Sequence, residues 1–286
     1  MTRVTSETTP VSTPTAGTRP PARFGALVAS EWIKLWSLRS TYWALGLGVV
    51  AVIGINVYST LALRRLLPEW SAEARESYNY MNDALGQAPY LLLLIAAGII
   101  GALSMAGEYA TGMIRTTFVA VPARRSVVIA KATVISGATL AVGIVVATTS
   151  VGLTQVLLSG QDAGFAISNK GVPTALVASA VVVPVCALVG MGIGVLIRHT
   201  AGAIFGVFTV IVILPQLTMG TTYSWVVDLN NSTLWSAWMT LRNTPIRELM
   251  PAELFTWPVG ASWLVLAVWP LVAVVAAVVV THRREV

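Results

Sequence analysis

Long stretches without a single charged residue limit what this chain can fold into. Each exceeds the roughly 20 apolar residues with which a helix crosses a bilayer. The six stretches, of 24 to 30 residues each, are Ser40–Leu63, Ala84–Gly107, Ala132–Gln161, Gly171–Ile197, Thr200–Val227 and Leu254–Thr281. Only 10% of the 286 residues are charged, too few to cover the surface of a water-soluble fold. The sequence therefore predicts an all-α polytopic membrane protein with six transmembrane helices, at about 41–63, 88–106, 132–158, 173–197, 201–219 and 260–281.

The distribution of charge between the two sides of the membrane predicts the orientation. With the N-terminus inside, the inner segments hold 12 Lys/Arg and 4 Asp/Glu, whereas the outer segments hold 6 and 8. Because inner loops of membrane proteins are enriched in Lys and Arg, both termini are expected in the cytoplasm. The net charge of +6 is thus a topology signal, and no nucleic-acid partner is expected.

The N-terminal region divides into two parts. Residues 1–22, rich in Thr, Ser and Pro, are expected to be a disordered cytoplasmic tail, and residues 23–286 to form the membrane domain. Within 23–39, apolar residues recur at helical spacing, which predicts an amphipathic helix lying in the membrane interface. Trp32 and Trp36 are expected to anchor it and Lys34 to face headgroups or a partner, whereas Glu31 interrupts the apolar arc.

Energy for active transport is expected to come from a separate cytoplasmic subunit, and sodium coupling through hydroxyls and backbone carbonyls is the open alternative. The six uncharged stretches contain no ionisable group that could relay protons through the membrane. The chain also has no G-x-x-x-x-G-K-[ST] loop, so it is not expected to be an enzyme that binds and hydrolyses ATP. No bound cofactor or metal is expected either, because the single cysteine and two histidines have no ligand spacing.

The largest polar inner segment, residues 107–125, has the composition of a partner-binding helix. Met113, Ile114 and Phe118 are large apolar residues among small polar ones. They are expected to fill a groove on another protein, with Arg115 as an ion-pairing or hydrogen-bonding contact. Glu108 is expected to stabilise a helix N-terminus or to meet a basic residue of the partner, and Gly112 to allow close backbone approach.

Two pairs of glycines at small-xxx-small spacing predict close helix contacts in lipid. They are Gly190 with Gly194, and Gly202 with Gly206, near the inner ends of the fourth and fifth spans. Packing within the chain and packing against a second chain are both open alternatives.

Several of these motifs together resemble the ABC-2 type permeases of bacterial ABC transporters. The resemblance is carried by an E-x-x-x-G-x-[IL]-R arrangement at Glu108, Gly112, Ile114 and Arg115, with Val-Pro-x-Arg-Arg following at 121–125. The segment 30–40, SEWIKLWSLRS, is similar to the one that precedes the first helix in that family. The resemblance covers residues 24–286.

The resemblance implies a membrane subunit in the bacterial cell membrane that pairs with a second permease chain, identical or paralogous. It would dock on cytoplasmic ABC ATPase subunits, which would hold ATP and Mg²⁺, through a coupling helix at about 109–120. Drug, antimicrobial-peptide or lipid-like efflux is the expected activity. The alternative is a non-transporting immunity or accessory protein that sequesters a ligand, and it would need no ATPase.

Overall fold

The computed structural model describes residues 23–37, 39–121, 123–161, 168–169, 171–219, 223–244 and 257–283. The expected disordered tail, residues 1–22, lies outside the described residues. In these ranges the chain forms helices and no strands. The helices are α1 (Phe24–Ser37), α2 (Arg39–Leu66), the 3₁₀ turn η1 (Leu67–Glu69), α3 (Ala72–Ser77), α4 (Met81–Ala84), α5 (Gln87–Ala110), α6 (Met113–Ala120), α7 (Arg124–Leu158), α8 (Val172–Ile197), α9 (Thr200–Phe208), the π-helical turn η2 (Thr209–Ile213), α10 (Leu214–Leu217), α11 (Ser224–Asn231), α12 (Leu234–Arg242) and α13 (Val259–Arg283).

Six segments of the described chain are helical, long and apolar enough to cross a bilayer, which confirms the predicted all-α polytopic fold. They are Thr41–Glu69, Met81–Ala110, Arg124–Leu158, Val172–Ile197, Thr200–Leu217 and Val259–Arg283. The fifth changes from α9 to the π-helical turn just before Pro215. Proline has no N–H for the carbonyl four residues earlier, so the hydrogen-bond register shifts there. The chain is a multi-pass membrane protein.

Helix α8 occupies the centre of the bundle. It contacts α5, α7, α9, α12 and α13, and 72% of its most apolar stretch is buried, against 22% for the most apolar stretches of α2 and α13. Ala, Gly, Val and Ser dominate its buried positions. Small side chains let neighbouring helices approach closely, and this contact takes the place of hydrophobic burial as the source of packing energy in lipid.

The glycine pairs noted in the sequence pack within the chain. A methyl group added at Gly190 would overlap the carbonyl oxygen of Gly98, and one at Gly194 would overlap that of Ala102, so both glycines permit the α5–α8 contact. Methyl groups at Gly202 and Gly206 would instead press on Ile197 and Ile193 of α8. Contacts within the chain therefore account for all four.

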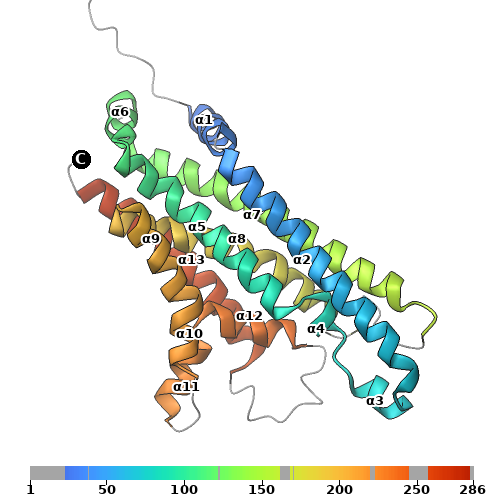
Figure 1. Ribbon diagram of the computed structural model, residues 1–286. Helices are drawn as coiled ribbons and strands as arrows, with labels where there is room; N and C mark the ends of the chain where they lie inside the picture. Colours follow the sequence, from blue (N-terminus) through green and yellow to red (C-terminus); the bar gives the residue numbers. More distant parts are fainter. Residues whose placement is uncertain are drawn as a thin grey trace, which may run out of the picture.

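The two ends of the bundle carry different short helices (Figure 1). Helices α1 and α6 and the last turn of α13 lie at one end, whereas α3 and α11 lie at the other. We call the first the inner end, because the charge distribution predicts that it faces the cytoplasm. At the outer end, α12 carries Trp238, and tryptophan commonly marks the bilayer interface in membrane proteins. Trp238 is instead fully buried and stacks on Tyr90, with 5.0 Å between ring centroids.

Candidate functional site

Helix α1 has two apolar faces rather than one. Leu27, Glu31 and Leu35, spaced four residues apart, are buried against the bundle, chiefly against α7. Trp32 and Trp36 are 46% and 39% exposed and contact each other at 5.6 Å between ring centroids. The tryptophans thus lie on the outward face, where indole rings suit the membrane interface. Glu31, which interrupts the apolar arc in the sequence, belongs to the inward face.

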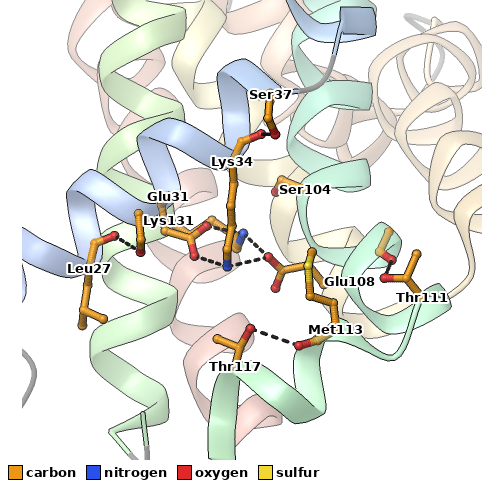
Figure 2. A network of polar contacts seen from close by, with 12 residues as sticks. Leu27, Glu31, Lys34, Ser37, Ser104, Glu108, Thr111, Met113, Thr117 and Lys131 are labelled. Atoms are coloured by element: carbon orange, nitrogen blue, oxygen red, sulfur yellow. Dashed lines mark hydrogen bonds and ion pairs between the residues drawn. The ribbon is translucent and has the colours of Figure 1, made fainter. Parts of the chain in front are cut away.

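Glu31 is part of a closed ring of four alternating charges, which we call the inner charge ring (Figure 2). Lys34 lies 2.7 Å from Glu31 and 3.1 Å from Glu108, measured from Nζ to the carboxylate oxygens. Lys131 lies 2.5 Å from the other oxygen of Glu31 and 2.9 Å from Glu108. The ring therefore joins α1, the last turn of α5 and the second turn of α7.

The charges of the ring balance, and three of its four side chains are withdrawn from water. Glu31, Glu108 and Lys131 side chains are 4–6% exposed, whereas that of Lys34 is 32% exposed. Burial lowers the pKa of Lys34, but the hydrogen bond to Glu31 and the attraction of Glu108 outweigh burial and raise it above its ordinary value. Lys34 is thus a cation at neutral pH. Removing one partner from such a buried set leaves an uncompensated charge, which typically costs about 3–5 kcal/mol.

The ring revises the expectation for Glu108. This residue lies in the last turn of α5, not at a helix N-terminus, and it pairs within the chain. A carboxylate near a helix C-terminus is disfavoured by the helix dipole, so the two ammonium groups have an added role there. Lys131 was missed in the sequence. It is the last charge before the 30-residue uncharged stretch, and this position at the start of a membrane span was the feature that could have indicated a buried, paired lysine.

Helix α6 follows α5 and precedes α7 in the chain, and only part of its surface is exposed. Ile114 and Phe118 are buried, with 2% and 8% of their surface exposed. The expectation that they fill a groove on a partner is therefore wrong: they anchor α6 to its own chain. Met113, Arg115 and Val119 are exposed, and Val119 is 85% exposed. An apolar–cationic–apolar surface thus remains available on α6.

The turn before α6 depends on a glycine. Gly112 has φ = +70° and precedes the first residue of α6, in the left-handed region that side-chain-bearing residues rarely adopt. No atom lies within 4 Å of where a Cβ would be placed. Gly112 therefore provides a backbone conformation and not the expected close approach.

Two arginines add support around α6. The guanidinium of Arg124, at the start of α7, lies over the Phe118 ring at 5.1 Å and donates to the carbonyl of Thr281 on α13 at 3.4 Å. Arg198, which ends α8, lies over Tyr109 of α5 at 4.8 Å. Cation–π contacts of this kind contribute roughly 0.5–2 kcal/mol. The α6 region is thus tied to α7, α8 and α13.

A cleft of about 580 Å³ opens beside the inner charge ring, between α1, α2, α5 and α7. Along α5 its lining changes from Ala96, Ile99 and Leu103 to Ser104, Glu108 and Thr111, so it is apolar toward mid-span and polar at the inner end. We call it the inner cleft. An amphiphile with one charged or polar end matches this gradient.

The site thus consists of an exposed surface on α6, a charge ring that ties its flanking helices to α1, and an amphiphilic cleft between them. Three residues singled out in the sequence, Glu31, Lys34 and Glu108, meet in the ring, whereas Met113 and Arg115 lie on the α6 surface. No protein-family model matches the chain, and no curated protein matches it.

Proposed function

We propose that this chain is the transmembrane permease subunit of an ATP-driven ABC exporter in a bacterial cell membrane, with α6 as its docking helix for a separate cytoplasmic ATPase. The observation that carries the proposal is the build of α6. One face is anchored by Ile114 and Phe118, and the rest of the helix leaves Met113, which also lines the inner cleft, Arg115 and Val119 exposed at the inner end. A short helix held firmly but left half-covered has the form of a docking element.

The connections of α6 support a role in transmitting motion. It is joined to α5 through two residues and to α7 through three, and the inner charge ring clamps those two helices to α1. A displacement of α6 by a partner would therefore move α5, α7 and α1 together instead of bending one loop. Because the chain has no ATP-binding loop of its own, a bound ATPase would supply that displacement.

The inner cleft supports an amphiphilic cargo. Its apolar wall suits an acyl or aromatic moiety, and the hydroxyl and charged groups at its inner end suit a polar head. Drugs, antimicrobial peptides and lipid-like molecules share this chemistry. A second permease chain would complete the transport pathway, as the family resemblance implies.

The test is copurification of the tagged chain with the ATPase encoded nearest to it, in detergent. Arg115→Ala with Val119→Ser removes a cation and an apolar contact that the fold does not need, so unfolding is unchanged. Loss of such a paired contact weakens association by more than tenfold. The matched control, Arg64→Ala with Arg65→Ala, alters two exposed arginines at the outer end and leaves association intact.

Two outcomes contradict the proposal. If the α6 double variant retains the ATPase at the wild-type level, α6 is not the docking element. If the wild-type chain binds no ATPase but retains an amphiphile, a sequestering accessory or immunity protein is favoured instead.

A further inference from the structure

A second, smaller pocket lies at the inner end, away from the inner charge ring. It has a volume of about 410 Å³ and is formed where α7 begins and α13 ends. Its lining residues are Arg125, Val278, Val279, His282 and Arg283. The pocket therefore combines basic side chains from two helices with two valines.

The electrostatics of this pocket favour an anion. Arg125 and Arg283 are exposed guanidiniums, and the described lining contains no acidic side chain. Arg125 also lies in the first turn of the 35-residue α7, where the helix dipole is positive. Two guanidiniums from separate helices can bind one phosphate from two directions, each with parallel N–H donors.

The apolar side of the pocket continues along α13. Val279 is 41% exposed, and Val275, Val272 and Leu271, at helical spacing before it, are 52%, 59% and 64% exposed. This row leads from the basic pocket toward the middle of a membrane span. A free phosphate would use the guanidiniums alone, whereas a phospholipid would also lay an acyl chain along these residues.

We propose that the α7–α13 pocket is a binding site for an anionic phospholipid of the inner leaflet, with its phosphate on Arg125 and Arg283 and an acyl chain along Val279 and Val275. Basic pockets between transmembrane helices on the cytoplasmic side suit such headgroups. The neighbouring Arg124 joins Thr281 of α13 to Phe118 of α6, so the lipid also stabilises the support of α6. This site does not depend on the transporter proposal.

The experiment measures lipid binding to the full-length chain in neutral detergent by native mass spectrometry and thermal unfolding. Phosphatidylglycerol, phosphatidylcholine and inorganic phosphate are added separately. We expect phosphatidylglycerol to remain bound and to raise the unfolding temperature, and the other two to have little effect. High salt weakens this binding, because the guanidiniums are exposed.

Variants distinguish binding in this pocket from a general electrostatic attraction between the chain and anionic lipid. Arg125→Gln with Arg283→Gln is expected to bind phosphatidylglycerol roughly thirtyfold more weakly. Each arginine contributes about 1 kcal/mol to binding of an anionic lipid, and each 1.4 kcal/mol changes the affinity about tenfold. Arg125→Lys with Arg283→Lys keeps both charges and retains most binding, which shows that these positions tolerate substitution. Arg64→Gln with Arg65→Gln, at the outer end, leaves binding unchanged.

Three results would overturn the proposal. Equal retention of phosphatidylcholine would show an apolar site without headgroup recognition. An equal response to inorganic phosphate would show a phosphate site without a lipid. Unchanged phosphatidylglycerol binding in the Gln double variant, with the fold intact, would place the lipid elsewhere. Each readout is independent of ATPase association, so failure here leaves the proposed function standing.

Discussion

The inner and outer ends of this bundle both bury charged side chains, but they hold them in different ways. At the inner end, two carboxylates and two ammonium groups alternate in a closed ring. At the outer end, Arg242 is 1% exposed and has no acidic partner within ion-pair distance in the described chain. Neutral oxygens surround it: the Leu85 carbonyl at 2.9 Å, Asn82 Oδ1 at 2.7 Å and Asn243 Oδ1 at 3.2 Å.

The difference lies in what each arrangement requires. Burial lowers the pKa of Arg242 to about 10, so its guanidinium remains charged at neutral pH while amide and carbonyl oxygens and the Trp238 face at 5.5 Å stabilise it. Two of these hydrogen bonds link α12 to α4 and to Leu85 directly after it, and the third joins Arg242 to its neighbour Asn243. In the inner charge ring the partners are charges, so each side chain depends on the others. We therefore expect loss of one charge to cost more at the inner end, where it leaves another charge unbalanced, than at the outer end.

The largest effect is expected for Lys131→Met. This substitution leaves Glu31 and Glu108 buried beside a single ammonium group and should lower the free energy of unfolding by about 3–5 kcal/mol. The measurement is denaturant unfolding in detergent micelles. Lys34→Met removes the same charge from a side chain that is 32% exposed, where water can replace it, and should cost less than half as much. Equal losses would show that burial does not set the strength of the ring.

Arg242→Met is expected to rank next, at about 2–3 kcal/mol. The change removes the donors to Leu85 and Asn82 but creates no unbalanced charge, so the cost is that of lost charged hydrogen bonds. Arg242→Lys should retain only part of the stability that Arg242→Met loses, because one ammonium group cannot reproduce the hydrogen bonds of the planar guanidinium. If Arg242→Met were costlier than Lys131→Met, the ranking of the two ends would be reversed.

Within the inner end, the apolar anchors of α6 should contribute less than the charges. Ile114→Ala deletes a buried side chain and is expected to cost about 2 kcal/mol, at the low end for such changes because α6 is short. Val119→Ala, on the exposed face of the same helix, should leave unfolding unchanged. Similar losses from both would mean that the buried and exposed faces of α6 are assigned wrongly.

The smallest effect is expected for Gly112→Ala. A side chain in the left-handed conformation costs roughly 1–2 kcal/mol. Gly107→Ala lies inside α5 with no atom near its Cβ position, and should be neutral or stabilise by roughly 0.5–1 kcal/mol. Opposite signs for the two glycines, seen as shifts of the unfolding midpoint, would confirm that only Gly112 has a conformational role.

The sequence was sufficient to predict the membrane spans, but not which face of each helix packs against the bundle. Uncharged stretches longer than 20 residues indicate membrane helices wherever they lie in the chain, because the bilayer imposes that length. The partner of Glu31 is set by packing between α1 and α7, whose contacting residues are about 100 positions apart. Periodicity shows that Glu31 lies among apolar residues, but it cannot reveal Lys131 opposite. Trp238 is a similar case, since an aromatic residue near a span end suits both the interface and the core.

The inward face of α6 was equally beyond sequence reasoning. Ile114 and Phe118 are four residues apart and so share one side of a helix, and this spacing fits a partner groove as well as the chain's own core. In the structure both residues are buried within the chain itself, and Arg124 at the start of α7 lies over Phe118. Met113 and Val119 are then the exposed apolar residues of α6, and the proposed function assigns them to the partner.

A double-mutant cycle on Glu31 and Lys131 tests most directly whether the inner charge ring acts as a unit. Glu31→Gln and Lys131→Met are made singly and together, and the free energy of unfolding is measured in the same detergent. Each single variant carries an unbalanced buried charge, whereas the double variant keeps the neutral Lys34–Glu108 pair. We expect each single change to cost about 3–5 kcal/mol and the double change to cost far less than their sum. Additive losses, to within about 0.5 kcal/mol, would show that the four charges are not coupled and would contradict the account of how α1 is joined to the helices that carry α6.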